Sequence, residues 1–297
     1  MSMALERGQR DERELLRALL EDQLHATQCV AAASDALSAA ADAVAEALRA
    51  GGRLIYLGAG ASGCLAMQDG AELPGTYGLA AASVAFATPG GEAFAAFSGS
   101  SGEDDEDDAL RAIGALVVGR LDLVIAVSAS GSTPFTLAGA RAAKAAGARL
   151  VAIACRAGAP LLSESDVGVL LDTGPEAVEG STRLAAGTAQ KAALGIISTL
   201  ACAKLGHVHR GLMVNLRPDN AKLRARACGI VRRLADVDEA AATAALENTD
   251  YDVKAAVVAA AGRLDVQGAK ALVAACDGDL GRALERATGN ERFQTRA

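Results

Sequence analysis

The chain has 297 residues, a formal net charge of −7 and 51% hydrophobic residues, yet aromatic residues make up only 3% and tryptophan is absent. This length suits one large domain with a smaller one, and the acidic charge argues against a nucleic-acid-binding surface. No apolar run reaches the roughly 18 residues that a membrane span needs, and the first residues lack the apolar stretch of a signal peptide. The six dispersed cysteines include no C-x-x-C pair, so we expect reduced thiols in a cytoplasmic protein.

Residues 1–50 are predicted to form helices. Leucines recur at helical spacing between Leu15 and Leu24, and the alanine-rich run 31–50 ends at Gly51-Gly52, a typical helix stop. Such a pair of helices can pack on another subunit or simply cover a sheet, and the sequence leaves both alternatives open.

Strand and helix patterns alternate from residue 53 to about residue 172. The candidate strands are residues 53–57, 82–87, 121–127, 150–154 and 167–171, and a clear helix pattern covers 134–146. This alternation predicts an α/β fold with a doubly wound, five-stranded parallel sheet and helices on both faces. Ligands of such folds bind at the carboxyl ends of the strands.

Two loops of small residues follow the first and third predicted strands. The loops GAGASG (58–63) and SASGSTP (128–134) each lead into a helix, an arrangement that presents backbone amides to an anion. The first also fits the dinucleotide pattern G-x-G-x-x-G. However, the second strand runs into TPGG (88–91) without the acid that would bind a ribose. We therefore favour a sugar monophosphate over NAD as the ligand of the two loops.

Three polar segments need separate interpretation. In EDDEDD (103–108), residues 104–108 are predicted to be a solvated helix start, whereas Glu103 at the edge is a candidate functional carboxylate. The segment 174–191 is dense in hydrogen-bonding groups where it enters a long apolar helix, which predicts a helix start that faces a ligand. His207 and His209 form an H-x-H pair, but no third metal ligand is evident nearby, so we expect a surface turn.

From residue 236 the chain is predicted to be helical, with a weak internal repeat. In each copy an aspartate, Asp252 or Asp279, precedes a helix and can cap it. These patterns divide the chain into an N-terminal helical segment (1–50), a sugar-phosphate-binding domain (51–235) and a small C-terminal helical, UBA-like module (236–297).

Several strings together resemble the N-acetylmuramic acid 6-phosphate etherase family, which has the sugar-isomerase (SIS) fold. They are the two loops, DGAELPGTYG (69–78), GEDD (102–105), GSTRLAAGTAQK (180–191) and LMVN (212–215). The likeness covers roughly residues 50–290, and GSTRLAAGTAQK is its most specific part.

The resemblance implies a lyase of cell-wall amino-sugar recycling that removes D-lactate from N-acetylmuramic acid 6-phosphate and leaves N-acetylglucosamine 6-phosphate. A base takes the C2 proton of the open-chain sugar, an acid helps the C3 ether oxygen to leave, and water then adds to the intermediate. Glu103 matches the family's base and Glu72 its acid. Two carboxylates with separated pKa values can perform this chemistry without a metal or another cofactor. A homodimer with shared active sites is also implied.

The sugar phosphate would be bound by the two loops and by the segment before the long apolar helix. The predicted binding residues are Gly60, Ser62, Gly63, Ser128, Ser130, Gly131, Ser132, Thr133, Glu179, Ser181 and Lys191. Each hydrogen bond to a charged group is worth about 1.5–3 kcal/mol. Several such bonds can therefore hold a phosphate dianion without a lysine.

The sequence departs from the family pattern at several positions. Cys64 and Ser132 stand where the family loops usually carry arginine, Ala61 replaces a threonine, Ala185 a lysine and Ser100 a glutamate. The family's N-terminal T-E-x-x-N segment is also not found. A phosphosugar with a different C3 substituent, a non-catalytic SIS-type sugar-phosphate sensor and an aldose–ketose phosphosugar isomerase therefore stay open as alternatives. Retention of both proposed acids favours chemistry over sensing.

Overall fold

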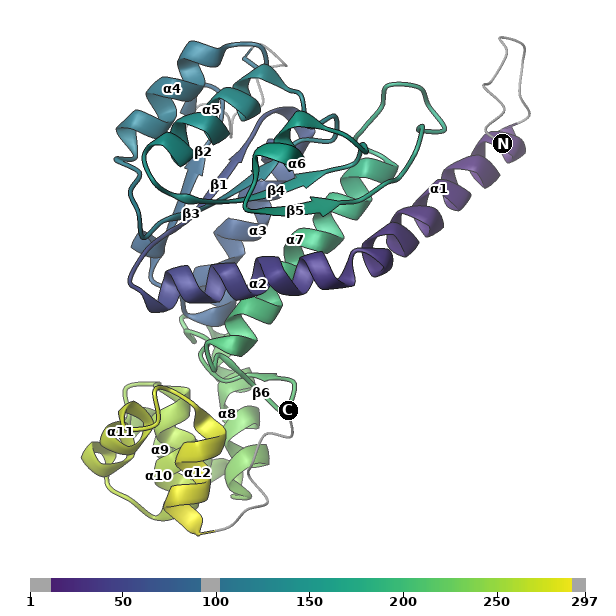
Figure 1. The fold of residues 1–297 in the computed structure, drawn as a ribbon. Helices are drawn as coiled ribbons and strands as arrows, with labels where there is room; N and C mark the ends of the chain where they lie inside the picture. The colour runs from purple at the N-terminus through teal and green to yellow at the C-terminus, as the bar shows by residue number, and fades with distance from the viewer. Residues whose placement is uncertain (1–11, 92–101, 290–297) are drawn as a thin grey trace. The chain divides into compact units, whose positions relative to one another are not determined.

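A computed structural model describes residues 12–91 and 102–289 of the chain (Figure 1). Contacts divide the chain into two compact units, one of Met1–Ala71 with Ala82–Ser198, and one of Glu72–Ala81 with Thr199–Ala297. The boundaries that we predicted after residues 50 and 235 follow sequence patterns rather than contacts, and they stay a prediction. None of the described helices is both long and apolar enough to cross a membrane.

The first unit is built on a five-stranded parallel sheet. Its strands are β1 (Leu54–Gly58), β2 (Val84–Ala87), β3 (Leu123–Val127), β4 (Arg149–Ala154) and β5 (Val167–Leu170), in the order β2-β1-β3-β4-β5. All four pairings are parallel. Continuous apolar runs form these strands because both faces of the sheet are covered. The five predicted strands and the doubly wound α/β fold are thus confirmed.

Helices cover both faces of this sheet (Figure 1). On one face α4 (Glu106–Ala115), α5 (Pro134–Ala145) and α6 (Pro160–Glu164) pack in one apolar cluster with Ile55, Val124 and Leu150 of the strands. On the other face α2 (Ser34–Arg49) contacts four strands, and α3 (Gly60–Tyr77) brings Gly70 against the rings of Tyr56 and Phe86. The chain therefore leaves β1 toward one face and β3 toward the other.

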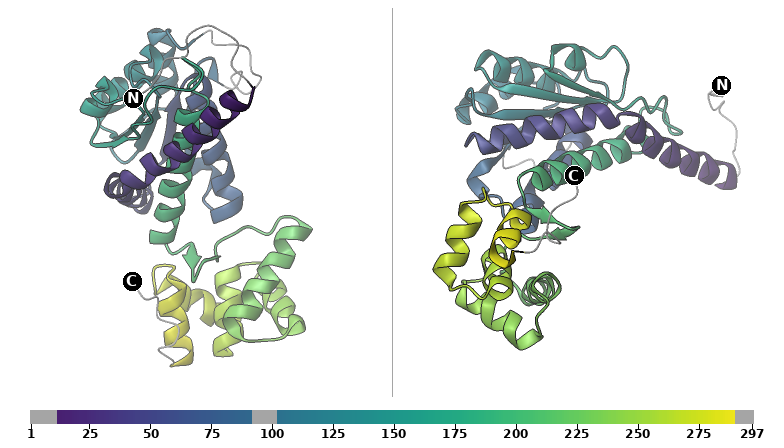
Figure 2. Two further views of the ribbon diagram at one scale, coloured as in Figure 1. Left: turned by 90° about the vertical axis from the view of Figure 1, so that its right-hand side faces the viewer. Right: turned by 60° about the horizontal axis from the view of Figure 1, so that its bottom comes forward.

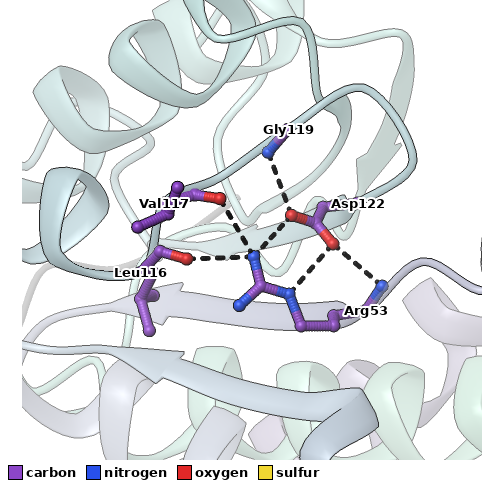
Figure 3. A network of polar contacts seen from close by, with 5 residues as sticks. All are labelled: Arg53, Leu116, Val117, Gly119 and Asp122. Atoms are coloured by element: carbon purple, nitrogen blue, oxygen red, sulfur yellow. Dashed lines mark hydrogen bonds and ion pairs between the residues drawn. The ribbon is translucent and has the colours of Figure 1, made fainter.

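An ion pair with several hydrogen bonds joins the amino ends of β1 and β3 (Figure 3). Asp122 is buried and accepts from the Arg53 guanidinium at 2.7 and 3.1 Å, from the Arg53 amide at 3.0 Å and from the Gly119 amide at 3.0 Å. Burial by itself raises the pKa of Asp122, but these donors outweigh it, so the pKa lies below its ordinary value. The network fixes β1 beside β3 at the edge opposite the two small-residue loops.

The helices predicted in residues 1–50 are confirmed from residue 12 on as α1 (Glu12–Ala32) and α2, and residues 1–11 lie outside the described residues. α1 contacts both the segment before α7 (Ala185–Lys204) and the first turn of that helix, because the Asp22 carboxylate accepts the Ala177 amide at 2.6 Å and Gln23 accepts from the Thr188 hydroxyl. Leu16, Leu20 and Leu24 of α1 are exposed and form an apolar stripe on this helix.

The second unit is mainly helical (Figure 2). A short hairpin of β6 (Val208–His209) and β7 (Leu212–Met213) precedes α8 (Ala221–Ala235), α9 (Glu239–Asn248), α10 (Val253–Gly262), α11 (Val266–Ala274) and α12 (Leu280–Thr288). Asp252 and Asp279 cap α10 and α12, each accepting a backbone amide at 3.0 Å, as predicted. Asn215, from the LMVN string, donates to the Tyr77 carbonyl at 2.8 Å and so closes the end of α3.

The histidine pair does not form a surface turn, and that prediction is wrong. His209 is only 3% exposed, and His207 is partly buried beside it. Burial, helped by the positive charge of Lys254, lowers the pKa of His207 to about 4 against the effect of a hydrogen bond with the Tyr77 backbone. Lys254 is itself buried and donates to the Gly278 carbonyl at 2.9 Å. The hairpin is therefore folded around neutral imidazoles.

We expect the second unit to lose stability as the pH falls from about 6.5 to about 4. The unfolded chain protonates His207 below about pH 6.5, whereas the folded chain resists protonation until about pH 4. The contribution of the neutral His207 imidazole to the free energy of unfolding is therefore complete above about pH 6.5 and is lost as the pH falls to about 4. His207→Gln should flatten the pH dependence of the urea-unfolding free energy. His25→Gln, at an exposed position of α1, is the control and should keep the wild-type slope; an equal slope in both variants would contradict the prediction.

Candidate active site

The two small-residue loops start at the carboxyl ends of neighbouring strands. Gly58 at the end of β1 pairs with Val127 at the end of β3, and the chain then departs to opposite faces of the sheet. A Cβ on Gly58 would lie 3.0 Å from the Val127 carbonyl oxygen, so this close approach depends on a glycine. Such a topological switch point is where doubly wound sheets bind ligands. The predicted loops are thus brought together.

The second loop gathers three hydroxyl groups at the start of α5. Ser128 Oγ lies 2.9 Å from Thr133 Oγ1 and 3.4 Å from Ser130 Oγ, and it accepts the Gly131 amide at 3.0 Å. Ser132 is exposed, and its amide donates to Ser130 Oγ at 3.2 Å. Hydroxyl groups and the positive end of a helix dipole converge here, which is the arrangement that binds an anion.

Glu103 lies between the two loops. Its carboxylate packs against Gly60 so closely that a Cβ on this glycine would overlap Oε1, and Gly60 has a φ of +53°, which favours glycine. The backbone carbonyl of Glu103 accepts the Phe135 amide, in the first turn of α5, at 2.9 Å. The residue that we predicted to be the base is therefore held by the first loop through its side chain and by α5 through its backbone.

The remaining acids of the run 104–108 have the structural role that we predicted. Asp105 caps α4 by accepting the Asp108 amide at 2.8 Å, and residues 104–107 are exposed. Glu103 therefore has different surroundings from its acidic neighbours. Residues 104–107 face solvent at the start of α4, whereas the Glu103 carboxylate contacts Gly60.

Ser62, in the first loop, is buried and bonded to α7. Its hydroxyl donates to Gln190 Oε1 at 3.0 Å, and Gln190 Nε2 donates to Cys155 Sγ at 3.8 Å. Burial raises the pKa of the Cys155 thiol to about 12, so this cysteine is a neutral partner and not a nucleophile. Gly63 closes the turn by donating to the Ala59 carbonyl at 2.9 Å. Sequence reasoning missed the link between Ser62 and Gln190, which lie 128 positions apart.

The segment before α7 is organised by Glu176. Its carboxylate accepts the amides of Ala185 and Ala186 at 2.8 and 3.0 Å and so caps the helix. Glu179 and Lys191 are exposed and Ser181 is partly exposed. Their role in binding stays a prediction. The cap was missed because its carboxylate precedes the helix by nine residues, outside the usual capping spacing.

Glu72, the predicted acid, lies on α3, twelve residues beyond Gly60. Glu72 belongs to the second unit, and its side chain is exposed. One turn earlier, Asp69 accepts from the Tyr56 hydroxyl at 2.6 Å and from the Ser198 hydroxyl at 3.0 Å, which fixes this helix on the sheet. The catalytic roles of Glu72 and Glu103 stay predictions, and Ser100 lies outside the described residues.

The sheet order and the paired loops at its switch point define a protein of the SIS class, and a SIS domain matches residues 22–155. A phosphoheptose isomerase from Francisella tularensis has this fold as well. It is 18% identical in sequence and covers 65% of this chain and 97% of that chain, with a TM-score of 0.50.

Relatives with higher identity define the family. N-acetylmuramic acid 6-phosphate etherase from Deinococcus radiodurans is 43% identical over 244 residues, which are 82% of this chain and 80% of the relative. The protein of that name from Salmonella choleraesuis is 38% identical over 272 residues, 92% of both chains. The chain therefore belongs to the N-acetylmuramic acid 6-phosphate etherase family, as the sequence strings predicted.

Gly60→Ala should lower the free energy of unfolding by about 1–2 kcal/mol, because it adds left-handed strain and a clash with the Glu103 carboxylate. Gly114→Ala in α4 meets open space and should instead stabilise the chain by up to about 1 kcal/mol. Urea unfolding of the double variant Gly60→Ala/Glu103→Ala tests the contact itself. Its loss should be smaller than the sum of the single losses; additive losses would show that the carboxylate does not meet residue 60.

Proposed function

We propose that this chain is a carbon–oxygen lyase that cleaves the lactyl ether of N-acetylmuramic acid 6-phosphate to N-acetylglucosamine 6-phosphate and D-lactate. The observation that carries the proposal is the position of Glu103, whose carboxylate packs on one anion-binding loop while its backbone bonds the helix of the other. Etherases with 38–43% identity over most of the chain support the same reaction. A phosphorylated wall sugar as substrate fits the cytoplasmic recycling of cell-wall amino sugars.

The reaction follows from the distribution of donors and acceptors. The hydroxyl groups of Ser128, Ser130 and Thr133, with the start of α5, are suited to the phosphoryl group. The open-chain sugar then extends toward Glu103, which takes the C2 proton. As the C3–O bond breaks, Glu72 gives a proton to the departing lactyl oxygen, and a C2–C3 double bond forms. Water adds its oxygen to C3 while a proton returns to C2, so substrate and water yield product and lactate.

We infer that Glu72 serves the active site of a second copy. Glu72 is exposed on α3 and belongs to the second unit, whereas Glu103 belongs to the first. α1 also exposes Leu16, Leu20 and Leu24 to 56%, 56% and 66%, at helical spacing on one side of the helix. An apolar stripe of this kind is suited to burial against another subunit. A homodimer with shared active sites accounts for both features.

Glu103→Gln and Glu72→Gln should each lower the release of D-lactate from N-acetylmuramic acid 6-phosphate by about 100-fold or more, because an amide cannot carry the proton. Asp104→Asn changes the exposed carboxylate next to Glu103 and should leave activity unchanged. Unchanged lactate release in either glutamine variant would refute its assigned role. Interconversion of aldose and ketose phosphates without lactate would instead assign an isomerase, and phosphosugar binding without any turnover would assign a sensor.

The same two variants test the shared site. In an equal mixture after subunit exchange, about half of the dimers are mixed, and each mixed dimer has one intact site. The mixture should therefore recover about a quarter of the wild-type activity. No recovery, with exchange verified, would contradict a site that takes one glutamate from each copy.

A further inference from the structure

The two anion-binding loops of this chain contain no cationic side chain. Residues 58–64 and 128–134 include no lysine, arginine or histidine. Hydroxyls and amides can hold an anion, but ionised donors form stronger bonds to it. A substrate with two negatively charged groups would therefore benefit from a cation on a neighbouring element.

Arg156 follows β4, the strand next to β3, at the same carboxyl edge of the sheet. Its neighbour Cys155 donates its amide to the Ala129 carbonyl in the second loop at 2.9 Å. On the other side, Ala159 lies against Gly131, where an added Cβ would come within 2.5 Å of the Ala159 Cβ. The backbone of Arg156 is thus bracketed by contacts with the loop that gathers the hydroxyl groups.

The guanidinium of Arg156 is exposed, and no acidic side chain pairs with it among residues 12–91 and 102–289. By contrast, Arg53, Arg141 and Arg149 of the same unit each pair with a carboxylate. A cation that is not neutralised, beside a loop of hydroxyl groups, is electrostatically complementary to an oxyanion. Arg183 and Lys191 are exposed as well, but in the described part of the chain their backbones make no hydrogen bond to residues 128–134.

We propose that Arg156 binds an oxyanion of the substrate and supplies the positive charge that both loops lack. This inference rests on the proposed function and adds a binding residue to it. The substrate offers two oxyanions, the phosphoryl group and the lactyl carboxylate, and the guanidinium fork fits both with paired hydrogen bonds. Arg156 acts on binding and takes no part in proton transfer.

Arg156→Ala should raise KM for N-acetylmuramic acid 6-phosphate by about 10- to 100-fold with little change in kcat. Arg156→Lys should lie in between, because it keeps the charge without the fork. Arg226→Ala removes an exposed arginine of α8 and should leave KM at its wild-type value. Calorimetry with N-acetylglucosamine 6-phosphate, which has only the phosphoryl group, separates the two anions. Weaker product binding by Arg156→Ala assigns the phosphoryl group, whereas a change in substrate KM alone assigns the carboxylate.

If Arg156 binds the phosphoryl group, a second substitution that supplies a cation nearby should compensate for its loss. Ser132→Arg adds a cation to the second loop and should restore product affinity in the Arg156→Ala background. Both KM and product affinity within about twofold of wild type would overturn the proposal, since a charge-assisted contact is worth at least about tenfold. Failure of the proposed function gives a different result, namely product binding that depends on Arg156 in a chain that releases no lactate.

Discussion

The packing of the Glu103 carboxylate against Gly60, a residue without a side chain, is the contact on which the candidate site depends. It brings an acid from the β2–α4 connection onto the first loop, while its backbone is bonded to the helix of the second. The position of both loops depends in turn on the pairing of β1 with β3, which the Arg53–Asp122 network supports at the opposite edge. Rigid elements thus hold the Glu103 carboxylate, the proposed proton acceptor, beside the first loop.

Electrostatic repulsion between the substrate and the two glutamates is consistent with a candidate site whose donors and acids come from several elements. A dianion and two carboxylates in one place would repel one another, so the phosphoryl group needs donors while the acids need separate surroundings. Hydroxyl groups of the second loop, the start of α5 and the proposed cation at Arg156 supply the donors. In the proposed dimer Glu103 and Glu72 come from different chains, and the reaction assigns proton acceptance to the first and proton donation to the second.

Much of the fold could be predicted from the sequence because its signals are local. Apolar runs predicted the five strands, small residues after two of them predicted the loops, and Asp252 and Asp279 preceded the helices that they cap. Local sequence patterns could not show which residues distant in sequence contact one another in the fold. The burial of His209 depends on elements far along the chain, and the bond from Ser62 ends on Gln190. Glu103 was separable from its acidic neighbours by its place beside Gly102 and by the family resemblance, while its contact with Gly60 required the structure.

Hydrogen exchange at C2 of N-acetylglucosamine 6-phosphate tests most directly whether Glu103 is the proton acceptor. In deuterated water the wild-type chain should replace the C2 proton of this product, seen in NMR spectra as loss of the C2–H signal, because the addition of water is reversible. Glu103→Gln should bind the product but leave the signal in place. Exchange by Glu103→Gln at the wild-type rate would contradict the role of Glu103, whatever the rate of lactate release.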